Sequence, residues 1–202
     1  MIDFVATFII LFAIIDPIGT IPVFIAVTAK YTRQQKKKIA IKAITASAGI
    51  LIFFVIAGEW LLRAMEIPIP AFQIAGGIVL FLFALSMIFG ESKPEQEIKL
   101  PHTDNETAIY PLAVPSIAGP GAMLTAVLLT ENSRYTIWQQ AQTVFVMLVV
   151  LAIALVGMLL ASYVHRIIGN SGASVISRVM GLILASAAMS NTLNGIKQFF
   201  QL

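Results

Sequence analysis

The chain has 202 residues, of which 58% are hydrophobic and 11% charged, with a mean hydropathy of +0.91. Soluble domains average about 45–50% apolar and about 25% charged residues, so this composition excludes a water-soluble globular domain and a disordered segment. The net charge of +3 does not indicate nucleic-acid binding, because most cations lie in one short stretch. The chain has no cysteine, and its two histidines are too far apart in the sequence to indicate a zinc centre. These features are typical of an integral membrane protein.

Six stretches are apolar over about 20 residues or more, the length that a helix needs to cross a bilayer. They cover residues 2–29, 39–62, 70–89, 108–129, 138–164 and 175–199. Only the connection at 91–107 is strongly polar, and its two prolines prevent a helix from running through it. We therefore predict one all-α membrane domain of six transmembrane helices, in which residues 1–90 and 108–202 form two halves joined by a cytoplasmic linker.

The distribution of Lys and Arg predicts the orientation of the chain. The odd-numbered connections carry ten of the thirteen cations, six of them between Lys30 and Lys42. Cytoplasmic loops are enriched in cations, so we expect these connections in the cytoplasm and both termini outside. The sequence begins Met-Ile-Asp, without the basic start of a cleaved signal peptide.

The two halves resemble each other. Pro17 and Pro120, each in a Pro- and Gly-rich motif, are 103 residues apart, and residues 77–86 match residues 181–190 at an offset of 104. The pairs in register are Gly77 with Gly181, Ala84 with Ala188 and Ser86 with Ser190. Because each half has three spans, the second enters the membrane the opposite way round. Such inverted-topology repeats are typical of secondary transporters, whose sites lie near the bilayer midplane.

The first and fourth stretches are both interrupted by proline and glycine, at residues 16–22 and 115–121. Proline lacks a backbone donor, and irregular backbone in hydrocarbon must be covered by protein or line a wet cavity. Two proline kinks accommodated by neighbouring helices are the purely structural interpretation. We predict two broken helices, whose second halves begin at Pro17 and Pro120.

The amino termini of these half-helices are expected to meet near the midplane, where their N–H groups suit a carboxylate. An acid inside a span marks a functional site, so Asp16 is a candidate to bind substrate, to cap its half-helix or to carry a proton. Two asparagines in the last span share a helix face and can line a pathway or bond between helices. The candidate substrate-binding residues are Asp16, Pro17, Gly19, Thr20, Pro22, Ser116, Gly119, Pro120, Gly121, Thr125, Asn191 and Asn194.

The sequence resembles the MarC family of bacterial and archaeal membrane proteins over essentially its whole length. The resemblance rests on Asp-Pro-Ile-Gly-Thr-Ile-Pro at 16–22, Ile-Ala-Gly-Pro-Gly-Ala at 117–122 and Gly-Gly-Ile at 76–78. A related archaeal member is described as a small neutral amino acid transporter, and the family is grouped with the lysine-exporter superfamily. The resemblance implies transport of small molecules, amino acids foremost, across the bacterial inner membrane. The motif residues are Asp16, Pro17, Gly19, Pro22, Gly119, Pro120 and Gly121.

We therefore predict a secondary transporter of small neutral amino acids that works by alternating access between the two broken helices. A passive channel and a membrane scaffold without transport are the alternatives. An intramembrane enzyme is not predicted, because the spans hold a single mid-membrane acid and no histidine. No cofactor or metal is expected, although a proton or sodium ion can couple transport. The expected partners are the lipid bilayer, the small-molecule substrate and a second copy of the chain in a homodimer, but no nucleic acid.

Overall fold

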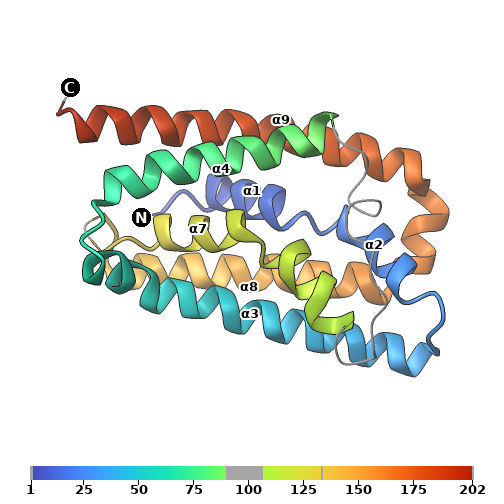
Figure 1. Ribbon diagram of the computed structural model, residues 1–202. Coiled ribbons are helices and arrows are strands. Elements are labelled where there is room, and N and C mark those ends of the chain that lie inside the picture. Colours follow the sequence, from blue (N-terminus) through green and yellow to red (C-terminus); the bar gives the residue numbers. More distant parts are fainter. Residues whose placement is uncertain (1, 90–106, 133, 202) are drawn as a thin grey trace.

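The computed structural model describes residues 2–89, 107–132 and 134–201, and in this part of the chain all regular secondary structure is helical. Figure 1 shows an elongated bundle with both termini at the same end. In chain order the elements are α1 (Phe4–Ile15), α2 (Thr20–Val27), α3 (Arg33–Ala64), α4 (Ile69–Phe89), the π-helix η1 (Ala108–Ile117), α7 (Pro120–Leu128), α8 (Ile137–Leu159) and α9 (Ala161–Phe199).

Five segments of the described chain are long and apolar enough to cross a membrane. They are Phe4–Val27, Arg33–Ala64, Ile69–Phe89, Ile137–Leu159 and Ser174–Phe199. These five overlap five of the six predicted spans and confirm a multi-pass helical membrane protein. The remaining predicted span, 108–129, consists of η1 and α7, which have 10 and 9 residues and are each too short to cross alone. Of the predicted linker 91–107, only Thr107 lies within the described residues.

The boundary between the last two predicted spans differs from the expectation. The span predicted to reach residue 164 ends as α8 at Leu159, and α9 begins at Ala161. Gly169 interrupts α9 with a φ of 65° and a ψ of 177°, a conformation that glycine adopts without steric cost. The membrane-spanning part of α9 follows this interruption, over Ser174–Phe199.

Matching capping boxes start α3 and α8, in which a Thr side chain and a Gln side chain satisfy each other's backbone N–H. Before α3, Gln35 donates its N–H to Thr32 Oγ1 at 3.4 Å, and Thr32 donates its N–H to Gln35 Oε1 at 2.9 Å. Before α8, Thr136 and Gln139 repeat both bonds at the same distances. The two boxes are 104 residues apart, which is the offset of the sequence repeat.

Helices α4 and α9 pack along each other over much of their length (Figure 1), and their closest backbone contacts are reciprocal. A Cβ atom on Gly77 would lie 2.9 Å from the carbonyl oxygen of Ala188, and one on Gly181 would lie 3.1 Å from that of Ala84. In the repeat predicted from the sequence, Gly77 is paired with Gly181 and Ala84 with Ala188. The absence of a side chain at each glycine thus brings equivalent positions of the two helices into close backbone contact.

The first broken segment lies largely inside the bundle. In the Phe4–Val27 segment 61% of the most apolar stretch is buried, against 22–39% in the other four spans. The helix that follows each break packs against a long helix of the other predicted half, α7 against α3 and α2 against α8. Gly58 of α3 lies against Val127 of α7, and Gly157 of α8 lies against Ile21 of α2.

Substituting Gly77 with Ala is expected to lower the free energy of unfolding by about 1–3 kcal/mol, the usual range for overpacking. The added Cβ would meet a backbone oxygen at 2.9 Å, so α4 and α9 must separate. Gly49→Ala is the matched control, because no atom lies within 4 Å of its added Cβ and Ala is the better helix former. Thermal unfolding of the purified variants in detergent measures both effects, and equal melting temperatures would contradict the close contact.

Candidate functional site

The first helix break is centred on Asp16. This residue ends α1, where its N–H donates to Phe12 O at 2.9 Å, and it has a left-handed backbone with φ 48° and ψ 65°. Asp tolerates this conformation better than most residues that have a side chain. The chain then resumes helical bonding, because the Thr20 N–H donates to Asp16 O at 3.0 Å. Helix α2 begins at Thr20, three residues after the predicted start at Pro17, because residues 17–19 form a turn.

The Asp16 carboxylate connects this break to the other half of the chain. The side chain is buried, with 1% of the residue exposed. Its Oδ1 accepts the Gly19 N–H at 3.0 Å, and its Oδ2 accepts the Ser177 hydroxyl of α9 at 3.2 Å. The carboxylate therefore caps the turn that leads into α2, which is one of the roles considered from the sequence, and it joins that turn to α9.

Gly19 and Thr20 complete this turn. A Cβ on Gly19 would lie 2.1 Å from Asp16 Oδ2 and 2.8 Å from Ser177 Oγ, so a side chain there would displace the carboxylate. The fully buried Thr20 hydroxyl donates to Asp16 O at 3.0 Å. Of the two prolines in the motif, Pro17 is buried in the turn and Pro22 is half-buried in α2.

The second break separates η1 from α7. The π-helix ends with a bond from the Ala118 N–H to Ala113 O at 2.8 Å, and two prolines inside it provide no N–H. Gly119 is extended, with φ −73° and ψ 171°, and α7 begins at Pro120 as predicted. No side chain caps this terminus, in contrast to the turn at Asp16. Its N–H groups and positive dipole end can therefore receive an anionic group.

The two breaks lie close together in the bundle. A Cβ on Gly121 would lie 2.8 Å from Leu80 and 3.8 Å from Ile14, which is two residues before Asp16. Ser116 and Thr125 are buried, with 2% and 3% exposed. The Thr125 hydroxyl has no hydrogen-bond partner among the described residues, a situation that costs about 1–3 kcal/mol for a buried group. This hydroxyl is a candidate ligand group in the second half of α7.

The two predicted asparagines lie in a different environment. Asn191 is half-buried and Asn194 is exposed, and Asn194 lines a shallow groove of about 570 Å³ with Phe81 and Ser190. In the described part of the chain, neither asparagine hydrogen-bonds to the broken helices. The polar group of α9 that reaches the first break is Ser177, which the sequence analysis missed. The repeat offset of 104 aligns Ser177 with Gln73, and two polar residues at matching places in apolar spans are a signal that could have identified it.

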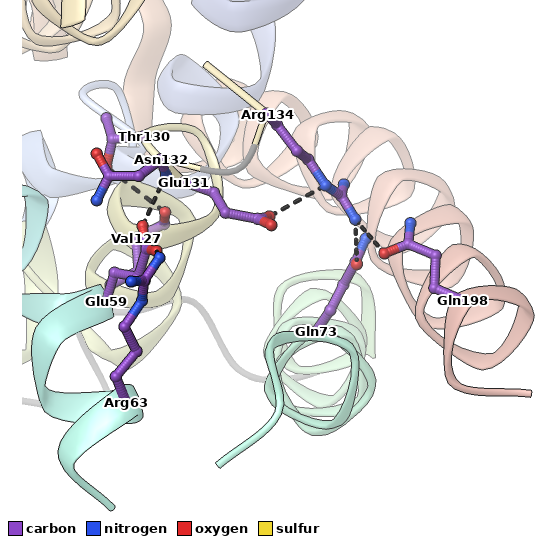
Figure 2. A network of polar contacts seen from close by, with 9 residues as sticks. All are labelled: Glu59, Arg63, Gln73, Val127, Thr130, Glu131, Asn132, Arg134 and Gln198. Atoms are coloured by element: carbon purple, nitrogen blue, oxygen red, sulfur yellow. Dashed lines mark hydrogen bonds and ion pairs between the residues drawn. The ribbon is translucent and has the colours of Figure 1, made fainter. Parts of the chain in front are cut away.

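A second polar cluster, hereafter the Arg134 cluster, lies where α3 ends and α4 begins (Figure 2). Arg134 Nε lies 3.1 Å from Glu131 Oε2, and its Nη2 donates to Gln73 Oε1 at 3.1 Å. The same guanidinium donates to Gln198 Oε1 near the end of α9. Glu131 is 5% exposed and Gln73 2% exposed. Arg134 thus joins the α7–α8 connection to both α4 and α9.

Glu59 makes the corresponding attachment to α3. It is 6% exposed, accepts the Asn132 N–H at 2.6 Å through Oε2 and pairs with Arg63 at 2.5 Å through Oε1 (Figure 2). A buried carboxylate requires such partners, because its desolvation is otherwise strongly unfavourable. The segment that connects α7 and α8 is therefore fixed to α3, α4 and α9 by charged and amide side chains.

Comparison with known proteins identifies the family. Residues 1–200 match the family described as MarC family integral membrane protein. A UPF0056 membrane protein of Methanocaldococcus jannaschii is 34% identical over 197 residues, which cover 96% of both chains. One of Pyrococcus horikoshii is 34% identical over 205 residues, or 99% of both chains. The UPF0056 membrane protein YhcE of Escherichia coli is 34% identical over 198 residues, or 96% of this chain and 91% of that protein. No solved structure matches the chain at a significant level. The chain belongs to the MarC family of integral membrane proteins.

Proposed function

We propose that this protein is a secondary transporter of small neutral amino acids, with its substrate site between the two broken helices. The observation that carries the proposal is the buried Asp16 carboxylate, which lies at a helix break and bonds to Ser177 of α9. Ionisable residues are rare within membrane spans, and those that occur usually mark a substrate or ion pathway. Broken helices at the contact between two repeats are the usual substrate sites of secondary transporters.

The proposed architecture is six transmembrane helices in two inverted repeats, 1–90 and 108–202, with η1 and α7 together forming the fourth span. The reciprocal Gly and Ala contacts of α4 and α9 support it, because a twofold axis generates every contact twice. The capping boxes at Thr32 and Thr136 give the same support at the same sequence offset. The two helix breaks occupy matching places in the two units.

The substrate class follows from the different chemistry of the two breaks. The uncapped start of α7 at Pro120 presents N–H groups that suit a carboxylate. Asp16 presents a carboxylate that suits an ammonium group. Gly121 lies against Ile14, so the two groups come from adjacent parts of the bundle. A zwitterion can satisfy both, and either a proton or a sodium ion is the proposed coupling ion.

The Arg134 cluster supplies the proposed outer closure. It lies at the end of α3 opposite the Lys-rich start of that helix, which we place in the cytoplasm by its charge. Both termini are then outside a bacterial inner membrane. In the described conformation the cluster holds the α7–α8 connection against α3, α4 and α9. Alternating access requires these contacts to open when the site faces outward.

Uptake of labelled alanine into proteoliposomes tests the proposal. We expect saturable uptake that glycine and serine inhibit and that lysine and glutamate do not. We also expect counterflow, in which unlabelled alanine inside the vesicles accelerates entry of the labelled substrate. Imposed proton and sodium gradients identify the coupling ion. Uptake that rises linearly with concentration and shows no counterflow would favour a channel, and no uptake by well-folded protein would contradict the proposal.

A further inference from the structure

A cavity of about 840 Å³ lies at the Lys-rich end of the bundle, apart from both helix breaks. It is enclosed by the end of α2, the start of α3 and the turn between α8 and α9. Among the described residues that line it, none belongs to η1, to α7 or to the turn at residues 16–19. The proposed substrate site therefore does not account for it.

One side of this cavity is apolar. Phe24 and Met158 are buried in its floor, with 3% and 1% exposed. Leu159 and Leu160 also line it and are 45% and 51% exposed. They lie where a membrane-spanning helix ends, so their exposed surface faces the hydrocarbon boundary rather than a closed core. This wall suits an acyl chain and offers nothing to a small polar ion.

The opposite side is cationic. Arg33, Lys36 and Lys37 from the first turns of α3 line the cavity, and none of the described residues that line it is acidic. Within the described residues none of these three side chains forms an ion pair. They are also near the amino terminus of α3, whose dipole favours a negative charge. No ion pair among the described residues therefore balances the positive charge of these three side chains, so a bound anion can do so.

We propose that this cavity binds an anionic phospholipid, with the headgroup phosphate at Arg33, Lys36 and Lys37 and an acyl chain along Leu159 and Leu160. A basic pocket between helices at the cytoplasmic surface is the arrangement that binds lipid phosphates. The apolar wall favours a lipid over free phosphate, because it lets hydrocarbon and phosphate bind together. This lipid site is separate from the proposed substrate site, and lipid binding there does not depend on transport.

The test compares two double variants that remove the same charge. Lys36→Gln/Lys37→Gln removes two lining cations, whereas Lys30→Gln/Lys38→Gln removes two exposed cations of the same segment that do not line the cavity. Binding of phosphatidylglycerol and phosphatidylcholine to the purified full chain is measured by native mass spectrometry and by the rise in melting temperature. We expect phosphatidylglycerol to bind the wild type selectively, about thirtyfold more weakly to the first variant, and within about threefold of wild type to the second.

Three results would overturn the proposal. Equal losses in the two variants would show attraction to the charged segment in general rather than a site. Equal binding of phosphatidylcholine would remove the role of the anionic headgroup. Inorganic phosphate at millimolar concentration that raises the melting temperature as much as the lipid would assign the cavity to a free anion. Substitution of the apolar wall by Leu160→Gln provides an independent check, because a lipid site predicts weaker phosphatidylglycerol binding and a phosphate site predicts no change.

Discussion

Asp16→Asn is expected to leave the protein folded and to weaken amino-acid uptake about tenfold to a hundredfold. The amide keeps the geometry of the cap, because its oxygen can accept the Gly19 N–H and its NH₂ can donate to Ser177 Oγ. What is lost is the negative charge that the proposed substrate ammonium requires, and a hydrogen bond to a charged group contributes about 1.5–3 kcal/mol. The measurement is the KM for labelled alanine in proteoliposomes, together with the melting temperature of the variant.

Asp16→Ala separates the two roles of this side chain. It removes the cap as well as the charge, so we expect the same loss of uptake and a further loss of about 1 kcal/mol of stability. Asp3 is the matched control, because its Oδ1 caps α1 by accepting the N–H groups of Val5 and Ala6 at 3.0 Å from an exposed position. Asp3→Asn and Asp3→Ala are expected to leave KM unchanged. Normal uptake by Asp16→Asn would show that Asp16 is a structural cap alone.

Arg134→Met is expected to lower the free energy of unfolding by about 2–3 kcal/mol. It removes the cation beside the buried Glu131 and the donor to Gln73 and Gln198. Removing one member of a fully buried pair costs about 3–5 kcal/mol, and the smaller figure reflects the 34% exposure of the Arg134 side chain. Thermal and denaturant unfolding in detergent measure the loss. A double variant, Arg134→Met/Glu131→Gln, is expected to recover part of it, because the carboxylate charge is then absent.

Arg63→Met is the control for this substitution. Arg63 pairs with Glu59 four residues earlier, much as Arg134 pairs with Glu131 three residues earlier, but its side chain is 67% exposed. Glu59 also keeps the Asn132 N–H when Arg63 is removed. Exposed pairs contribute about 0–1 kcal/mol, so the melting temperature is expected to fall only slightly. A larger loss for Arg63→Met than for Arg134→Met would contradict the assignment of Arg134 as the central residue of the cluster.

Much of the fold is predictable from the sequence, because a segment that crosses a bilayer as a helix must be apolar over about 20 residues. Five of the six predicted apolar stretches coincide with helical segments that are long and apolar enough to cross a membrane, and their boundaries differ from the predicted ones by up to six residues. The interruptions were predictable for a similar reason, since proline cannot donate an N–H, and α7 begins at Pro120. The start of α2 at Thr20 could not be predicted, because it depends on the left-handed backbone of Asp16. An aspartate tolerates that conformation but does not require it.

The contacts of the site could be predicted only in part. The sequence indicated Asp16 as an important acid because a carboxylate is rare within a span. Its partner Ser177 is 161 residues away, and hydropathy contains no information on which helix faces meet. Gln73 and Gln198 are likewise 61 and 64 residues from Arg134. Such contacts follow from helix packing, which is set by small residues such as Gly77 and Gly181 rather than by the polar groups themselves.

The reciprocal contact of α4 with α9 bears on how such a chain can originate. Because Gly77 meets Ala188 and Gly181 meets Ala84, equivalent positions of α4 and α9 contact each other. In the proposed inverted-repeat architecture such a contact is self-complementary, so two separate copies of one three-helix unit, inserted in opposite orientations, could form it before any covalent link existed. Fusion of two such genes then preserves an interface that already works. Expression of residues 1–98 and 99–202 as separate polypeptides should accordingly reconstitute the bundle.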